Sequence, residues 1–145
     1  MIVMVAFAPG AQAEAALAAG IREAHRRHWD FVIASHAFHD SEHGLMTAER
    51  TQVVQSLARA LSLATPEERQ YFESIDLNID ESAQADVGEF LLEAAAKRKA
   101  ELLVLGLRGK PQSGKLHLGS SVRRVLLGAP CPVLVVKTDT LTRGS

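Results

Sequence analysis

Cysteine and net charge are both scarce in this sequence, and each scarcity excludes a class of protein. The only cysteine, Cys131, cannot form a disulfide within the chain, which excludes a disulfide-stapled secreted scaffold. The formal net charge of −1 provides no electrostatic attraction toward nucleic acid or an anionic membrane surface. Low-complexity tracts are absent as well, so we expect a folded chain.

Long apolar runs are also missing, and none could span a membrane. The first run, Ile2–Ala8, has no Lys or Arg before it and ends at Pro9, which is unlike a secretion signal even though Ala11–Ala13 resembles a cleavage site. We therefore expect a cytoplasmic protein that contacts neither membrane nor nucleic acid. Its 145 residues, 47% apolar and 23% charged, are typical of one globular domain, with a core of about residues 1–137 and a polar tail at 138–145.

Strands alternate with helices along the sequence. Apolar runs and two-residue alternation predict five strands, at residues 2–7, 30–37, 73–79, 102–105 and 132–137. Helical spacing predicts helices at residues 11–28, 47–64, 82–99 and 120–127, with a short helical turn from Thr65 to Phe72. This order implies parallel strands joined by right-handed crossovers. We expect an α/β fold: a single-domain, five-stranded parallel sheet with helices on both faces and a Rossmann-like topology.

Two of the predicted helices carry local signals. Thr65 is the expected N-cap of the short helical turn, with Pro66 at the first helical position and Glu68 three residues after the cap. The alanine-rich first helix has small residues on one face, including Ala16 and Gly20. This face favours close packing on a sheet.

A glycine-containing segment, Gly106–Ser121, follows the fourth predicted strand, at the crevice where the residues after Phe7, Ala34 and Leu105 should meet. Glycines let a phosphate group approach the main chain, and free amide groups at a helix start attract it. Serine hydroxyls there can cap the helix or donate hydrogen bonds to phosphate. A loop of this length in a compact domain usually has a function, so we predict phosphate binding; the alternative is an ordinary connection with glycines at its turns. The residues that would take part are Gly106, Gly109, Gly119, Ser120 and Ser121. Arg108, Lys110 and Lys115 would add positive charge nearby.

Part of this segment has the glycine and lysine spacing of a P-loop but lacks other residues that a P-loop requires. The spacing Gly109-x4-Gly114-Lys115 matches, but Leu116 stands where Ser or Thr is needed to hold magnesium, and Pro111 intervenes. A dinucleotide-binding G-x-G-x-x-G fingerprint is missing too. We therefore reject both kinds of site.

The whole motif, Gly106-x2-Gly109-x9-Gly119-Ser120-Ser121, resembles the nucleotide motif of ATP-binding universal stress proteins. The resemblance is specific over residues 101–137 and extends elsewhere only to chain length and strand order. It implies an adenine nucleotide alpha hydrolase-like fold, bound ATP with Mg²⁺, and a stress-response role exerted through an unknown protein partner. It also implies a homodimer formed through the strand Pro132–Lys137, whose edge would otherwise expose unpaired backbone groups.

The resemblance assigns roles to individual residues. Leu105 and Gly106 would lie beside the ribose and phosphates, the stretch from Ala6 to Ala8 would line the ribose and adenine, and Ala37 would contact the adenine. The phosphates would be bound by Gly109, Gly119, Ser120 and Ser121, with Arg108 nearby.

One position departs from the family pattern. Ala8 stands where nucleotide-binding members usually carry Asp, which removes a hydrogen-bonding carboxylate. One such bond contributes roughly 0.5–1.5 kcal/mol, or up to about tenfold in affinity. We expect weaker or less base-selective binding, and not its loss.

Other polar residues give weaker signals. The spacing of His36, His39 and His43 matches no strong metal-binding pattern, so we expect histidines at the crevice edge. Cys131 has no neighbouring acid or His in the sequence, which indicates a packing residue and not a nucleophile. No catalytic triad or carboxylate pair can be argued from spacing, so ATP hydrolysis should be slow at most. The alternatives are a nucleotide-free stress protein that acts by dimerisation and partner binding and, last, a nucleotidyl-transferring relative.

Overall fold

The computed structural model describes residues 1–8, 11–36, 45–82, 86–107 and 120–137, and within them five strands form one parallel sheet. The strands are β1 (Ile2–Phe7), β2 (Asp30–His36), β3 (Leu77–Ser82), β4 (Leu102–Leu107) and β5 (Val133–Lys137). Their order across the sheet is β3-β2-β1-β4-β5, so β1 lies in the middle and β3 and β5 form the edges. The predicted five-stranded parallel sheet is confirmed.

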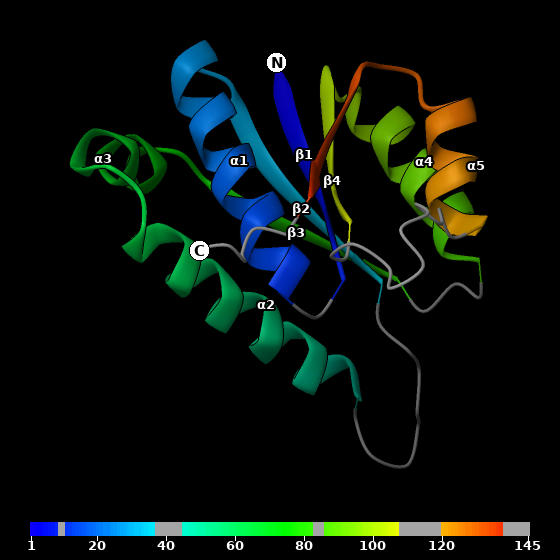
Figure 1. Ribbon diagram of the computed structural model, residues 1–145, viewed down its shortest axis with the longest axis horizontal. Coiled ribbons are helices and arrows are strands. Elements are labelled where there is room, and N and C mark those ends of the chain that lie inside the picture. The colour runs from blue at the N-terminus through cyan, green and yellow to red at the C-terminus, as the bar shows by residue number, and fades with distance from the viewer. Residues whose placement is uncertain (9–10, 37–44, 83–85, 108–119, 138–145) are drawn as a thin grey trace.

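Helices cover both faces of this sheet, as predicted. They are α1 (Ala11–Arg27), α2 (Leu45–Ser62), α3 (Pro66–Ser74), α4 (Val87–Arg98) and α5 (Ser120–Gly128). The first three lie on one face, and α4 and α5 lie side by side on the other (Figure 1). Right-handed crossovers explain this division, because the chain moves from β1 to β3 in one direction and from β4 to β5 in the other. No helix in the described ranges is long and apolar enough to cross a membrane.

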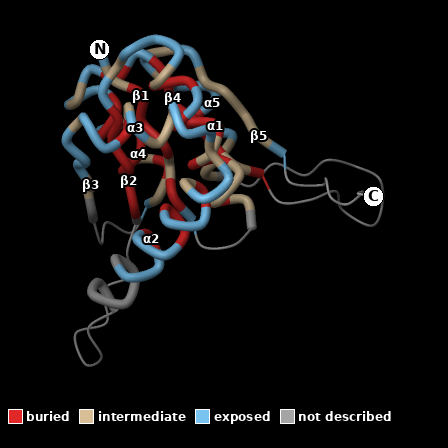
Figure 2. The backbone as a smooth tube through the Cα atoms, turned by 90° about the vertical axis from the view of Figure 1, so that its left-hand side faces the viewer, coloured by how far each residue is buried: buried red, intermediate tan, exposed pale blue. Residues whose placement is uncertain are grey.

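The hydrophobic core lies on both sides of the central strands. Val3 and Val5 of β1 pack in the cluster with α1, and Met4, between them, packs in the cluster with α4 and α5. All three are fully buried. The edge strand β5 is only half-buried and is tan in Figure 2, where the buried strands are red. Continuous apolar sequence in β1 therefore reflects burial on both faces.

Helix α1 approaches the sheet closely through its small residues, as the sequence predicts. A Cβ atom on Gly20 would lie 2.4 Å from Val5 Cγ2 and 3.0 Å from the ring of Phe31. Ala16 and Ala24, on the same helix, are buried as well. Any larger side chain at Gly20 would have to push the helix away from β1 and β2.

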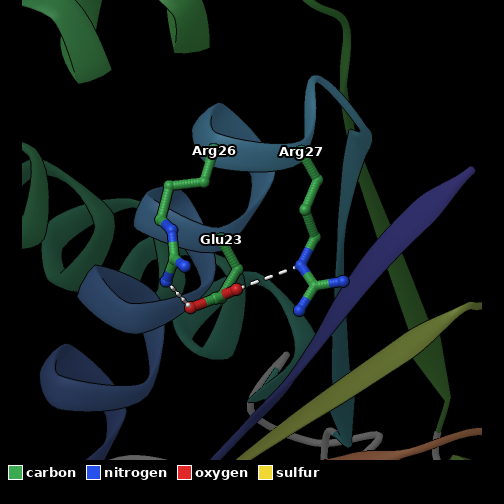
Figure 3. Close-up of polar contacts among 3 residues, drawn as sticks. All are labelled: Glu23, Arg26 and Arg27. Atoms are coloured by element: carbon green, nitrogen blue, oxygen red, sulfur yellow. Dashed lines mark hydrogen bonds and ion pairs between the residues drawn. The ribbon is translucent and has the colours of Figure 1, made fainter.

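The far end of α1 holds a nearly buried carboxylate. Glu23 lies between two arginines of its own helix and accepts hydrogen bonds from Arg26 Nη1 at 3.1 Å and Arg27 Nε at 3.0 Å (Figure 3). The Arg27 guanidinium also lies over the Trp29 ring, 4.8 Å from its centroid. These contacts compensate the buried charge. The helix ends just beyond, where His28 takes a left-handed conformation and the Trp29 amide donates to the Ala24 carbonyl at 3.0 Å.

The predicted strand at residues 73–79 is wrong in its first half. The predicted capping box at Thr65 and Glu68 is present, but the helix that it starts continues to Ser74. Phe72 holds this helix in place by packing edge-on against Phe31, with ring centroids 5.1 Å apart. Strand β3 begins only at Leu77. The alternating residues Leu77 and Ile79 do lie in β3, and the error is the extension of the strand back to residues 73 and 74, which belong to α3.

Several other boundaries differ from the sequence prediction. Helix α4 begins at Val87 and not at residue 82, because Asp86 is its N-cap and accepts a hydrogen bond from the Glu89 amide at 3.0 Å. Helix α2 spans residues 45–62 and not 47–64, and β4 continues to Leu107. The last difference moves Gly106 from the predicted loop into a strand.

Candidate functional site

A pocket of about 120 Å³ opens at the carboxyl ends of β1 and β4. These neighbouring strands lead into helices on opposite faces of the sheet, which makes their junction the topological switch point where open α/β sheets bind ligands. The residues Ala6 to Ala8 form the β1 side, and Leu105 and Gly106 form the β4 side. The remaining walls come from α4 and α5, the two helices on one face.

Half of the ten residues predicted for the site meet at this pocket. Its lining includes Ala6, Ala8, Leu105, Gly106 and Ser121. The backbone of Ser120 begins α5 beside them. The other predicted residues, Ala37, Arg108, Gly109 and Gly119, lie outside the described residues, so the roles assigned to the ten stay predictions.

Gly106 has a packing role that the sequence did not reveal. It pairs in register with Val136 of β5, and a Cβ atom on it would lie 2.3 Å from the backbone oxygen of Gln12 in α1. The glycine therefore lets the first turn of α1 approach the end of β4. Since β1 leads directly into α1, the first turn of α1 then packs against the ends of both strands that form the pocket.

The described walls of the pocket are mainly apolar. Val87 and Leu91 of α4 face Val122 and Val125 of α5, and Ser121 alone among the described lining residues carries a polar side chain. An apolar cavity of roughly 150 Å³ holds one benzene ring, so this pocket has room for about one aromatic ring. Polar recognition by these walls must come from the Ser121 hydroxyl and from backbone groups.

Sequence reasoning missed the contribution of α4 to this pocket. Val87 and Leu91 fit the apolar face of a helix packed on a sheet, and nothing in their spacing distinguishes a pocket wall from a core. Only the order of the strands across the sheet places α4 beside α5. Local spacing along the chain does not determine that order.

Cys131 is not among the described residues that line the pocket. Cys131 is half-buried against the cluster formed with α4 and α5; burial first, and then the charge of Glu101, raises the pKa of its thiol. A raised pKa disfavours the reactive thiolate at neutral pH, in agreement with a packing role. His39 and His43 lie outside the described residues. Within the described ranges, no three His, Cys, Asp or Glu side chains gather in a way that could hold a metal ion.

The model of the universal stress protein family matches residues 1–137 of the chain. The chain belongs to the universal stress protein family. A universal stress protein of Mycolicibacterium smegmatis is 32% identical to this one over 136 residues, covering 94% of this chain and 97% of the relative. The family resemblance predicted from the glycine motif is therefore confirmed at the level of the family.

Solved structures confirm the fold of this universal stress protein. The structure of a universal stress protein from Archaeoglobus fulgidus superposes with a TM-score of 0.69 at 22% identity, covering 94% of this chain and 98% of that one. The structure of the universal stress protein from the same organism in complex with dAMP gives a TM-score of 0.64 at 18% identity, with the same coverage. The predicted α/β fold with one parallel sheet is thereby confirmed.

Substituting Gly106 tests the close approach of α1 to β4. Gly106→Ala should lower the free energy of unfolding by about 1–3 kcal/mol, because the new methyl group meets the Gln12 main chain, which cannot rotate away. Chemical denaturation of both proteins measures the difference.

Gly128→Ala is the matched control. A Cβ atom there meets only the Leu92 side chain, at 3.1 Å, and the stability should stay within about 0.5 kcal/mol of the wild type. Equal effects of the two substitutions would contradict the packing role of Gly106.

Proposed function

We propose that this universal stress protein binds ATP with Mg²⁺ at the carboxyl ends of β1 and β4 and signals nucleotide occupancy to a partner protein. The observation that carries the proposal is the assembly of Ala8, Gly106 and Ser121, from three separate parts of the sequence, at one pocket. The pocket lies at the switch point of an open α/β sheet and beside the start of α5, where helix amide groups favour an anion. The dAMP complex of the Archaeoglobus fulgidus protein supports an adenine nucleotide as the ligand.

The apolar walls indicate how the nucleotide would be held. A base or ribose would pack against side chains such as Leu105 and Val122, while the phosphates would reach the amide groups and hydroxyls at the start of α5. The described lining contains no carboxylate, and Ala8 occupies the position of the usual Asp. Binding should therefore depend on shape and phosphate contacts more than on hydrogen bonds to the base.

The homodimer belongs to the same proposal. Strand β5 pairs with β4 on one side, and its other side is an edge of the sheet. Its residues Val133–Val136 are half-buried in the single chain. Pairing with β5 of a second copy would cover the unpaired N–H and C=O groups. A cytoplasmic location and the existence of a partner protein stay predictions.

A nucleotide-free protein is the second candidate, and two observations favour it. Ala8 removes one hydrogen-bonding group, and about 120 Å³ is small beside the roughly 300–1,000 Å³ that is typical of pockets for whole ligands. Such a protein would act by dimerisation and partner binding alone. We do not propose turnover, because the described pocket walls offer no side chain that could act as a general base.

Calorimetric titration with ATP and magnesium decides between the two candidates. After removal and identification of any co-purified nucleotide, the wild type should bind ATP, and Gly119→Val should lose binding because the valine obstructs the phosphate position in the motif. Gly114→Val, in the same segment but outside the family motif, should bind as the wild type does. No binding up to millimolar ATP, with no nucleotide carried through purification, would refute the proposal and favour the nucleotide-free candidate.

Restoring the missing carboxylate at position 8 tests the proposal by a gain of ATP affinity, where Gly119→Val tests it by a loss. Ala8→Asp should tighten ATP binding by up to about tenfold, because the carboxylate adds a hydrogen bond at the adenosine end. Ala8 is exposed, so the new charge stays solvated in the free protein. The same titration with GTP separates the base from the ribose, which ATP and GTP share. A smaller gain with GTP would place the carboxylate at the base, and an equal gain would place it at the ribose. No gain with ATP would mean that Ala8 faces neither group.

A further inference from the structure

Helices α4 and α5 touch at an unusually close point beside the pocket. Gly88, in the first turn of α4, is buried, and a Cβ atom on it would lie 2.9 Å from Arg124 Cδ and 3.1 Å from Arg124 Cβ. The aliphatic part of Arg124 therefore crosses the first turn of α4 over a position where any side chain would obstruct it. The glycine permits this crossing.

Beyond the crossing, Arg124 is held by one carboxylate of α4, Glu89. Its Nη2 atom donates a hydrogen bond to Glu89 Oε1, and the two groups form an ion pair. The hydrogen bond and charge of Glu89, and more weakly the charge of Asp86, raise the pKa of the guanidinium above its ordinary value. Asp86 is also the N-cap of α4 and accepts a hydrogen bond from the Glu89 amide. One side chain of α5 thus faces both acids at the start of α4.

The same two stretches of helix form opposite walls of the pocket. Val87, between Asp86 and Gly88 in the sequence, lines it from α4, while Ser121 and Val125 line it from α5. Ser121 precedes Arg124 by three residues, which is about one helical turn and places both on the same side of α5. The separation of the two helices at Arg124 therefore sets the width of the pocket and the position of the Ser121 hydroxyl.

We propose that Arg124 and Glu89 are positioning residues that fix the first turn of α5 against α4 and so hold the pocket at the width its ligand needs. The pair contacts no ligand in this account and acts through Ser121, Val122 and Val87. The choice of ATP as the ligand rests on the proposed nucleotide binding. The positioning of α5 by the helix contact does not depend on that proposal.

A simple charge effect makes the opposite prediction for one variant. If Glu89 acted only through its charge, Glu89→Gln would remove a repulsive carboxylate near an anionic ligand and tighten ATP binding. If Glu89 positions α5, the same variant should weaken ATP binding, by about three- to tenfold. The direction of the change, and not its size alone, therefore separates the two accounts.

The test is calorimetric titration of ATP with magnesium into a small set of variants. Glu89→Gln and Arg124→Gln should each weaken binding, and the double variant should be no worse than either one, because both remove the same contact. Arg124→Lys keeps the charge and should stay within about twofold of the wild type.

Glu14→Gln is the matched control for the loss of one carboxylate. The Glu14 and Glu89 side chains are almost equally exposed, at 34% and 35%. Glu14 pairs with Arg59 at 2.5 Å, and this pair joins α1 to α2 on the other face of the sheet. Glu14→Gln should leave ATP affinity within about twofold. Unchanged or tighter binding by Glu89→Gln, or equal weakening by Glu14→Gln, would overturn the proposal.

Hydrogen–deuterium exchange of the ligand-free protein provides a measurement that does not depend on nucleotide. Glu89→Gln should increase exchange in peptides covering the first turns of α4 and α5, and Glu14→Gln should not. If the wild type binds no ATP, the proposed function fails, and this comparison alone decides the inference. Unchanged exchange at α5 in Glu89→Gln would overturn it.

Discussion

The parallel pairing of β1 with β4 is the constraint on which the candidate site depends. Its register, with Val3 opposite Leu102 and Val5 opposite Val104, brings together two strand ends that are far apart in the sequence. Because α1 and α5 then leave toward opposite faces, a pocket opens at the junction of the two strand ends that neither strand could form alone. The absence of a Cβ atom on Gly106 allows α1 to lie close to the second of these strands.

The sequence was most informative where one physical requirement dominated. Apolar runs buried on both faces identified β1 and β4, and the Thr65–Glu68 capping box located the start of α3. It misled at the start of β3, because the predicted strand reached back to residues 73 and 74, which belong to α3, the helix whose Phe72 packs on Phe31. A contact between segments far apart in the chain decided that boundary, and such contacts are not encoded in local periodicity.

In the candidate site, too, some residues could be predicted from a local sequence pattern and others could not. The glycine motif indicated the family, and the resemblance drawn from it named five of the residues that line the pocket. Val87, Leu91 and the Arg124–Glu89 contact could not be predicted, because they depend on the side-by-side packing of α4 and α5. The apolar character of the described walls also became visible only once those helices were placed. Together with Ala8, it implies that the proposed nucleotide would be recognised more by fit than by hydrogen bonds.

The most direct test of this account follows the methyl groups of four alanines by NMR during titration with ATP and magnesium. Ala6 and Ala8 line the pocket, whereas Ala24 and Ala60 are buried in the cluster on the α1 and α2 face. The account predicts saturable shifts of the Ala6 and Ala8 signals while those of Ala24 and Ala60 stay in place. Saturable shifts confined to Ala24 and Ala60, or no shift of Ala6 and Ala8 at millimolar ATP, would contradict it.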